Sequence, residues 1–198
     1  MINDLLIIAA AYLIGAFPHL LLLARLHRIE PHGDLHMALW QQQGPAWGLL
    51  VVSIDIAKGI AAVLLVRWLG FDTNIIVLCG LAAVCGQMWP VFKGFDGEKG
   101  NTTGAGAAAA VTFWPVILAL IPVIMALLLK LYKATRLKNM SPGQRFKTGA
   151  GSSTFLPIGV AFSFLILPFI AWLYNEPPDV VGSFTALFGL IMLRRLTA

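Results

Sequence analysis

A stretch rich in glycine and charge, GFDGEKG from Gly94 to Gly100, is the segment best suited to bind an anion. Glycine lets backbone N–H groups approach a ligand closely, and a helix expected to begin near Thr102 would add the positive end of its dipole. Lys99 supplies a full positive charge. A structural turn is the alternative, and Asp96 and Glu98 would repel an anion. The residues expected to hold a phosphate here are Gly94, Gly97, Lys99, Gly100 and Thr102.

Two opposite charges, Asp55 and Lys58, lie three residues apart within an otherwise apolar segment. This spacing places both side chains on one helical face, where a pair costs far less in hydrocarbon than either charge alone. We therefore predict an intramembrane ion pair. Its role is either to fix helix packing or to serve a functional site, since charges inside a membrane often mark one.

Four histidines fall between His19 and His36, and His32 and His36 have the i, i+4 spacing that could hold a metal. Gly33 follows His32, so a helix through both is not assured, and Asp34 is the nearest carboxylate. The alternative is a surface loop whose histidines lie near lipid headgroups. We therefore assign no metal site.

The composition requires that these groups be positioned by membrane-spanning helices. Of the 198 residues 59% are hydrophobic and only 12% are charged, and mean hydropathy is +0.83, whereas soluble domains carry about 25% charged residues. An ordinary cytosolic protein is excluded. The net charge of +5 is better explained by membrane topology and lipid contact than by nucleic-acid binding, because no basic block is interleaved with aromatics.

We predict an all-α integral membrane protein with about seven transmembrane or half-membrane helices, forming a single polytopic domain over residues 1–198. A break is expected in the first segment at Gly15 to Pro18, and another at Pro115, after a segment too short to cross comfortably. The seven segments are Leu5 to Leu26, Trp47 to Trp68, Ile75 to Trp89, Thr103 to Phe113, Val116 to Tyr132, Phe155 to Tyr174 and Val180 to Leu193.

Lysine and arginine concentrate in alternate loops, which predicts the orientation of the chain. Basic residues cluster at Arg25, Lys99, Lys138 and Arg194, whereas the remaining loops carry acidic residues such as Asp72 and Glu176. We therefore expect the N-terminus outside and the C-terminus in the cytoplasm. No internal repeat supports an inverted-repeat transporter.

Three stretches of the sequence resemble the acyl-phosphate-dependent glycerol-3-phosphate acyltransferases (PlsY) of bacterial phospholipid synthesis. They are GLAAVCGQMWPVFKGFDGEKG (Gly80 to Gly100), WGLLVVSIDIAKG (Trp47 to Gly59) and AYLIGAFP (Ala11 to Pro18). The resemblance implies a seven-span fold in the bacterial inner membrane. It also implies acyl transfer from acyl-phosphate to glycerol 3-phosphate, giving lysophosphatidic acid, without a metal, coenzyme A or another cofactor.

The same resemblance shows where this sequence departs from the family pattern. Gln87 stands where the family carries histidine, Glu98 replaces the first glycine of GGKG, and the family's SGN motif has no counterpart. No catalytic residue is therefore assigned. The resemblance implies that Lys99, Arg145 and Arg194 hold substrate phosphates.

Two functions remain open at this point. The first is a membrane acyltransferase of this family, with substitutes for the missing groups among His32, His36, Thr102 and Thr103. The second is a catalytically inactive relative that serves as a structural or accessory subunit of a membrane assembly, with membrane lipids and other subunits as partners.

Overall fold

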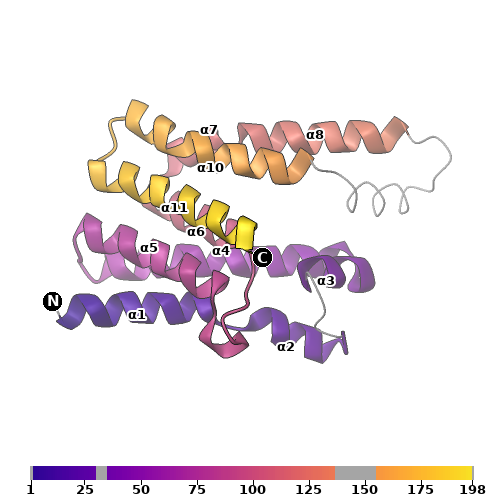
Figure 1. The fold of residues 1–198 in the computed structure, drawn as a ribbon, viewed down its shortest axis with the longest axis horizontal. Coiled ribbons are helices and arrows are strands. Elements are labelled where there is room, and N and C mark those ends of the chain that lie inside the picture. The colour runs from indigo at the N-terminus through magenta and orange to yellow at the C-terminus, as the bar shows by residue number, and fades with distance from the viewer. Residues whose placement is uncertain (1, 30–34, 137–154, 198) are drawn as a thin grey trace.

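The computed structural model describes residues 2–29, 35–136 and 155–197, and all of its regular elements are helices. Most run roughly parallel to the long axis of the molecule (Figure 1). The elements are α1 (Ile2–Ala16), α2 (His19–Leu26), α3 (Leu35–Gln43), α4 (Pro45–Trp68), α5 (Thr73–Met88), the 3-10 turn η1 (Val91–Lys93), α6 (Asn101–Val111), α7 (Phe113–Ala119), α8 (Ile121–Arg136), α10 (Phe155–Leu173) and α11 (Pro178–Thr197).

Six helical segments in the described part of the chain are long and apolar enough to cross a membrane. They agree with six of the seven predicted segments and confirm a multi-pass helical membrane protein. The predicted break in the first segment is also present, because α1 ends at Ala16 and α2 begins at His19, after Pro18. The spanning segments are Ile2–Leu26, Pro45–Trp68, Thr73–Lys93, Phe113–Lys133, Leu156–Leu173 and Pro178–Thr197.

The seventh predicted segment is the short helix α6, which has 11 residues and so rises about 16 Å, half the thickness of a hydrocarbon core. Its last residues lie at the end of the bundle where α4 finishes, since Arg67 donates to the Val111 carbonyl at 3.0 Å. Its first turn contacts Asp55, the eleventh residue of α4. The loop before α6 therefore reaches about midway along the molecule (Figure 1).

The break after α6 falls at Thr112 and not at Pro115, where we expected it. Thr112 has an extended backbone, with φ −146° and ψ 128°, and α7 starts at the next residue. Pro115 is the third residue of α7, where the missing N–H costs nothing because the first-turn amides have no partner within the helix. A second break, at Leu120, separates α7 from α8.

Small residues let α4 and α6 pack with their backbones in contact. A Cβ added to Gly59 would lie 2.1 Å from the Thr103 carbonyl oxygen, and one added to Gly106 would lie 2.2 Å from that of Ile56. Close approach of this kind is typical of helix pairs in membranes. It holds the first turn of α6 against the middle of α4.

Replacing Gly59 with alanine is expected to destabilise the protein by about 1 to 3 kcal/mol, the usual cost of overpacking, because the obstructing atoms are backbone. Gly182→Ala is the matched control, since that glycine is also helical but a Cβ there meets nothing within 4 Å. Thermal melting in detergent measures both. A Gly59→Ala variant that melts with the control would show that the α4–α6 contact is looser than described.

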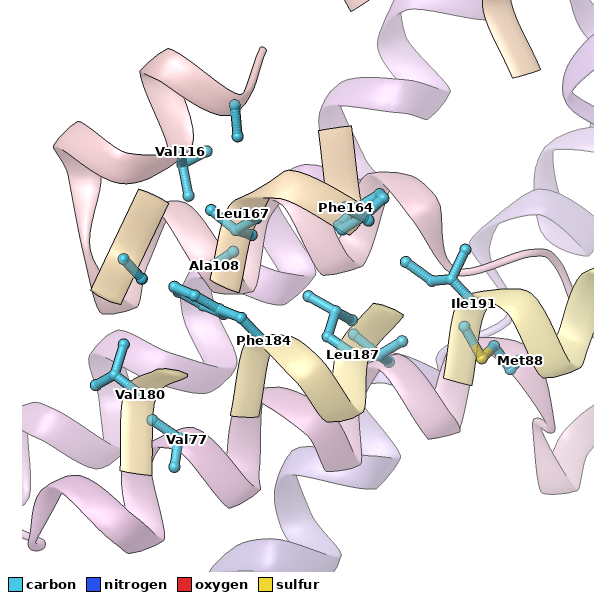
Figure 2. Close-up of a cluster of buried hydrophobic side chains, with 13 residues drawn as sticks. Val77, Met88, Ala108, Val116, Phe164, Leu167, Val180, Phe184, Leu187 and Ile191 are labelled. Carbon is cyan, nitrogen blue, oxygen red and sulfur yellow. The ribbon is translucent and has the colours of Figure 1, made fainter. Parts of the chain in front are cut away.

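A buried apolar cluster holds α5, α6, α10 and α11 together (Figure 2). Phe184, Leu187 and Ile191 of α11 pack between Val77 and Met88 of α5 on one side and Phe164 of α10 on the other. This packing places the end of α11 beside the loop that precedes α6. Cys79 is fully buried, as expected of a small hydrophobic residue, and Cys85 is partly buried.

Helix α3 was not predicted, because no helical segment was expected between Leu26 and Trp47. It packs on α4, with Leu35 and Leu39 buried in an apolar cluster shared with Val51 of α4. Its second residue is His36, whose side chain is thereby directed toward the middle of α4.

Candidate active site at the start of helix α6

Asp55 is the centre of a polar cluster inside the helical bundle, and its side chain is fully buried. Lys58 Nζ lies 3.2 Å from Asp55 Oδ1, so the predicted ion pair is present. The cluster is larger than the sequence suggested. His36 Nε2 lies 2.7 Å from Asp55 Oδ2, and the Thr102 hydroxyl donates to the same oxygen at 3.1 Å.

Lys58 joins this cluster to the break between α1 and α2. Its ammonium donates to the Gly15 carbonyl at 3.0 Å and lies 3.4 Å from His19 Nδ1. His19 Nδ1 also lies 3.4 Å from the Phe17 carbonyl oxygen, and Nε2 faces Asp55 Oδ1 at 3.4 Å. Polar side chains from four helices thus surround Asp55.

His36 lies between two carboxylates, because Nδ1 lies 3.6 Å from Glu98 Oε2 while Nε2 contacts Asp55. Burial alone would lower the pKa of His36, but hydrogen bonding and charge attraction to Asp55 and Glu98 outweigh it and raise the pKa to about 10. His36 is therefore a cation at neutral pH, and its partner is a protein carboxylate. His32 lies outside the described residues.

A cavity of about 220 Å³ opens between α3, the end of α5 and the start of α6. Two side-chain oxygens near it, Gln87 Oε1 and Asn101 Oδ1, are buried without a hydrogen-bond partner in the described structure. Unpartnered buried oxygens of this kind can accept hydrogen bonds from a ligand. The lining residues are His36, Val52, Gln87, Glu98, Lys99, Gly100, Asn101 and Thr102.

The first turn of α6 presents amides to this cavity. Gly100, with φ 71°, precedes the helix as its N-cap, and the amides of residues 99–103 do not donate to any carbonyl of the described backbone. The exposed side chain of Lys99 stands beside them. Free amides, a helix dipole and a lysine together form a site for an anion.

The rest of the glycine-rich loop does not form the cradle that we expected. Gly97 N–H donates to the Met88 carbonyl and Glu98 N–H to the Gln87 carbonyl, both at 3.1 Å. Because these two amides are already hydrogen-bonded to carbonyls at the end of α5, they are unavailable to a ligand. Gly94, with φ 62°, lies at the exposed tip of the loop. Of the residues expected to hold a phosphate, Lys99, Gly100 and Thr102 line the cavity.

Arg194 is buried and holds the loop in place. One guanidinium nitrogen donates to Asp96 Oδ1 at 2.8 Å and to the Gly97 carbonyl at 2.7 Å. The hydrogen bond from Arg194 lowers the pKa of Asp96. Arg194 thus joins α11 to the loop, and its predicted contact with a substrate phosphate stays a prediction. Arg145 lies outside the described residues.

A second, smaller cavity of about 40 Å³ lies on the other side of Glu98, at the break between α1 and α2. His19, Lys58 and Lys93 line it, and Gln87 and Glu98 line both cavities. The sequence did not indicate His19 or Glu98 as site residues, and it suggested His36 only as a metal ligand or a substitute catalytic group, without a protein partner. The grouping of all four histidines within residues 19–36 was the one available signal.

The described fold and this cluster define a multi-pass helical membrane protein with a polar site recessed among its spans. Residues 5–196 match the family model for glycerol-3-phosphate acyltransferase. A relative from Dehalococcoides mccartyi, glycerol-3-phosphate acyltransferase 4, is 31% identical over 98% of this chain and 78% of its own length. One from Synechococcus sp. is 32% identical over 84% of this chain and 88% of its own. This chain belongs to the glycerol-3-phosphate acyltransferase family.

Solved structures support the same fold. The crystal structure of PlsY, an integral membrane glycerol 3-phosphate acyltransferase, in its lysophosphatidic acid form, superposes with a TM-score of 0.78. It is 23% identical, and the match covers 98% of this chain and 88% of that one. The glycerol 3-phosphate form of that protein gives 0.77.

Proposed function

We propose that this chain transfers an acyl group from acyl-phosphate to glycerol 3-phosphate and releases lysophosphatidic acid and phosphate. The observation that carries the proposal is the cavity at the start of α6, where Lys99 and free backbone amides meet partly buried polar side chains. Family membership identifies the reaction class. The accessory-subunit alternative gains no support from the residues that the structure describes.

In this proposal the phosphate of glycerol 3-phosphate binds at the first turn of α6. There the helix dipole contributes about half a positive charge and Lys99 a full one. The hydroxyl groups of the glycerol then lie toward Gln87 and Asn101, whose side-chain oxygens lack partners. His36 adds a second positive charge beside the cavity. The donor is already an activated mixed anhydride, so positioning and neutralisation of phosphate charge supply most of the catalysis.

The same proposal assigns an orientation, with the cavity open to the cytoplasm of a bacterium and the C-terminus on that side. In a chain with Cys79 and Cys85 replaced, we expect a membrane-impermeant maleimide to label Asp72→Cys in intact cells and to spare Lys133→Cys. Both positions should be labelled after lysis. Labelling of Lys133→Cys in intact cells would reverse or break the assigned topology.

Acyl transfer by the purified protein tests the reaction itself. The protein in detergent is incubated with a long-chain acyl-phosphate and radiolabelled glycerol 3-phosphate, and lysophosphatidic acid is measured by chromatography. We expect product from acyl-phosphate and none from the matching acyl-coenzyme A. Product only from acyl-coenzyme A would change the donor, and no product from either would favour the accessory-subunit alternative.

A further inference from the structure

Gln87 is a buried polar side chain at the place where the two cavities meet. It is the second-to-last residue of α5 and is only 4% exposed, yet it lines both the 220 Å³ cavity and the 40 Å³ cavity. No hydrogen bond joins its side-chain amide to any other residue that the structure describes. Buried polar groups are normally paired, so an unpaired amide between two cavities indicates that a ligand completes its hydrogen bonding.

The backbone that carries this amide is fixed by close packing on both sides. The Gln87 carbonyl accepts a hydrogen bond from Glu98 N–H at 3.1 Å, and a Cβ added to Gly97 would lie 2.1 Å from the same oxygen. The preceding residue, Gly86, packs as closely on α1, because a Cβ there would lie 2.1 Å from the Tyr12 carbonyl oxygen. Gln87 is therefore held in position before a ligand binds, as a catalytic group must be.

An amide side chain can contact both reacting groups of an acyl transfer at once. It carries an oxygen that accepts hydrogen bonds and a nitrogen with two N–H donors. The proposed function puts a glycerol hydroxyl beside Gln87, and the carbonyl that this hydroxyl attacks must then lie within reach of the same amide. Negative charge develops on the carbonyl oxygen during attack, and a donor held ready for that charge makes a large contribution to catalysis.

The charges around Gln87 suit an oxygen that becomes negative. Lys58 and Lys93 line the smaller cavity, and Lys99 lines the larger one. Glu98 lines both cavities, but one of its oxygens lies 3.9 Å from Lys93 Nζ, which balances its charge. The lysines thus outnumber the carboxylate beside Gln87, and their attraction for an anionic oxygen is strengthened by partial burial.

We propose that Gln87 is a catalytic residue that hydrogen-bonds to both substrates: its oxygen accepts from the attacking glycerol hydroxyl, and its nitrogen donates to the carbonyl oxygen of acyl-phosphate. The inference rests on the proposed function. The hydroxyl oxygen bonds to the carbonyl carbon, the bond from that carbon to the phosphate oxygen breaks, and phosphate leaves with the electron pair. The hydroxyl proton departs on the released phosphate, so Gln87 neither gains nor loses a proton.

Steady-state kinetics of Gln87→Met test this role, with Gln87→His as the variant that keeps one donor and one acceptor. Loss of a single donor to a developing oxyanion lowers rate about 10²- to 10³-fold, so we expect kcat of Gln87→Met to fall at least 100-fold. Glycerol 3-phosphate should bind no more than about tenfold more weakly, the scale of one neutral hydrogen bond. Gln87→His should recover part of kcat. Gln43→Met, which removes an exposed glutamine at the end of α3, is the control and should keep wild-type kinetics.

Infrared spectroscopy observes the carbonyl contact without turnover. The probe is a long-chain ketophosphonate with an isotope-labelled carbonyl, in which a methylene group replaces the bridging oxygen of acyl-phosphate and prevents acyl transfer. We expect its carbonyl stretch to move to lower wavenumber on binding to wild type and to Gln87→His, because a hydrogen bond weakens the double bond. On Gln87→Met it should stay near its value in detergent alone. A stretch that does not move in wild type overturns the inference, whatever the variants do.

The kinetic outcomes separate the two claims. A wild-type protein without acyl transfer refutes the proposed function and this inference with it. An active wild type whose Gln87→Met variant keeps its kcat refutes the role of Gln87 alone. So does an equal loss of kcat in Gln87→Met and Gln87→His, since packing and not hydrogen bonding would then explain it. Melting temperatures close to wild type exclude misfolding as the cause of a lower rate.

Discussion

Replacing Asp55 with asparagine is expected to lower the free energy of unfolding by about 3 to 5 kcal/mol. The change keeps the shape of the side chain but removes the negative charge that faces Lys58 and His36. Removing one partner of a buried ion pair leaves uncompensated charge in a medium that solvates it poorly. Thermal melting in detergent should show a large decrease in melting temperature. Acyl transfer should be lost because His36 loses the carboxylate that positions it.

A double-mutant cycle shows whether this loss comes from the pair. Adding Lys58→Met to Asp55→Asn removes one orphaned charge and should recover part of the stability, with a coupling of about 0.5 to 3 kcal/mol. Recovery is incomplete because His36 still lacks its carboxylate. The control Asp72→Asn removes an exposed carboxylate and should change stability by less than about 0.5 kcal/mol. Strictly additive effects of the two buried substitutions would contradict the pairing.

The spanning helices were predictable because a bilayer imposes its thickness on any apolar segment that crosses it. The short helix α6 was predictable for the same reason, as a segment too short to cross. The position of the break after α6 was not predictable, because Pro115 lies in the first turn of the next helix, where proline does not end a helix. Helix α3 escaped prediction because its burial depends on contact with Val51 of α4.

The site was predictable only where its residues are close in sequence. Three-residue spacing was enough to pair Asp55 with Lys58. By contrast, His36 and Thr102 reach Asp55 from 19 and 47 residues away, and such contacts exist only once α3 and α6 pack on α4. The glycine loop shows the opposite error. Its composition suggested free amides, whereas the carbonyls at the end of α5 already accept hydrogen bonds from those of Gly97 and Glu98.

The largest expected effect on substrate binding is at Lys99. Replacing it with methionine removes the full positive charge beside the first turn of α6 while keeping a long apolar stem. A charge-assisted hydrogen bond contributes about 1 to 3 kcal/mol, so we expect glycerol 3-phosphate to bind about 10- to 100-fold more weakly. The loss should be smaller at high salt because the Lys99 side chain is exposed.

Binding of the acceptor phosphate at the start of α6 is measured directly by calorimetric titration of the purified protein with glycerol 3-phosphate. Wild type and Lys99→Met are compared with Lys133→Met, which removes an exposed lysine from α8. We expect binding by wild type, the same affinity for Lys133→Met, and a 10- to 100-fold loss for Lys99→Met. Equal affinities for all three proteins, or no binding by wild type, would contradict it.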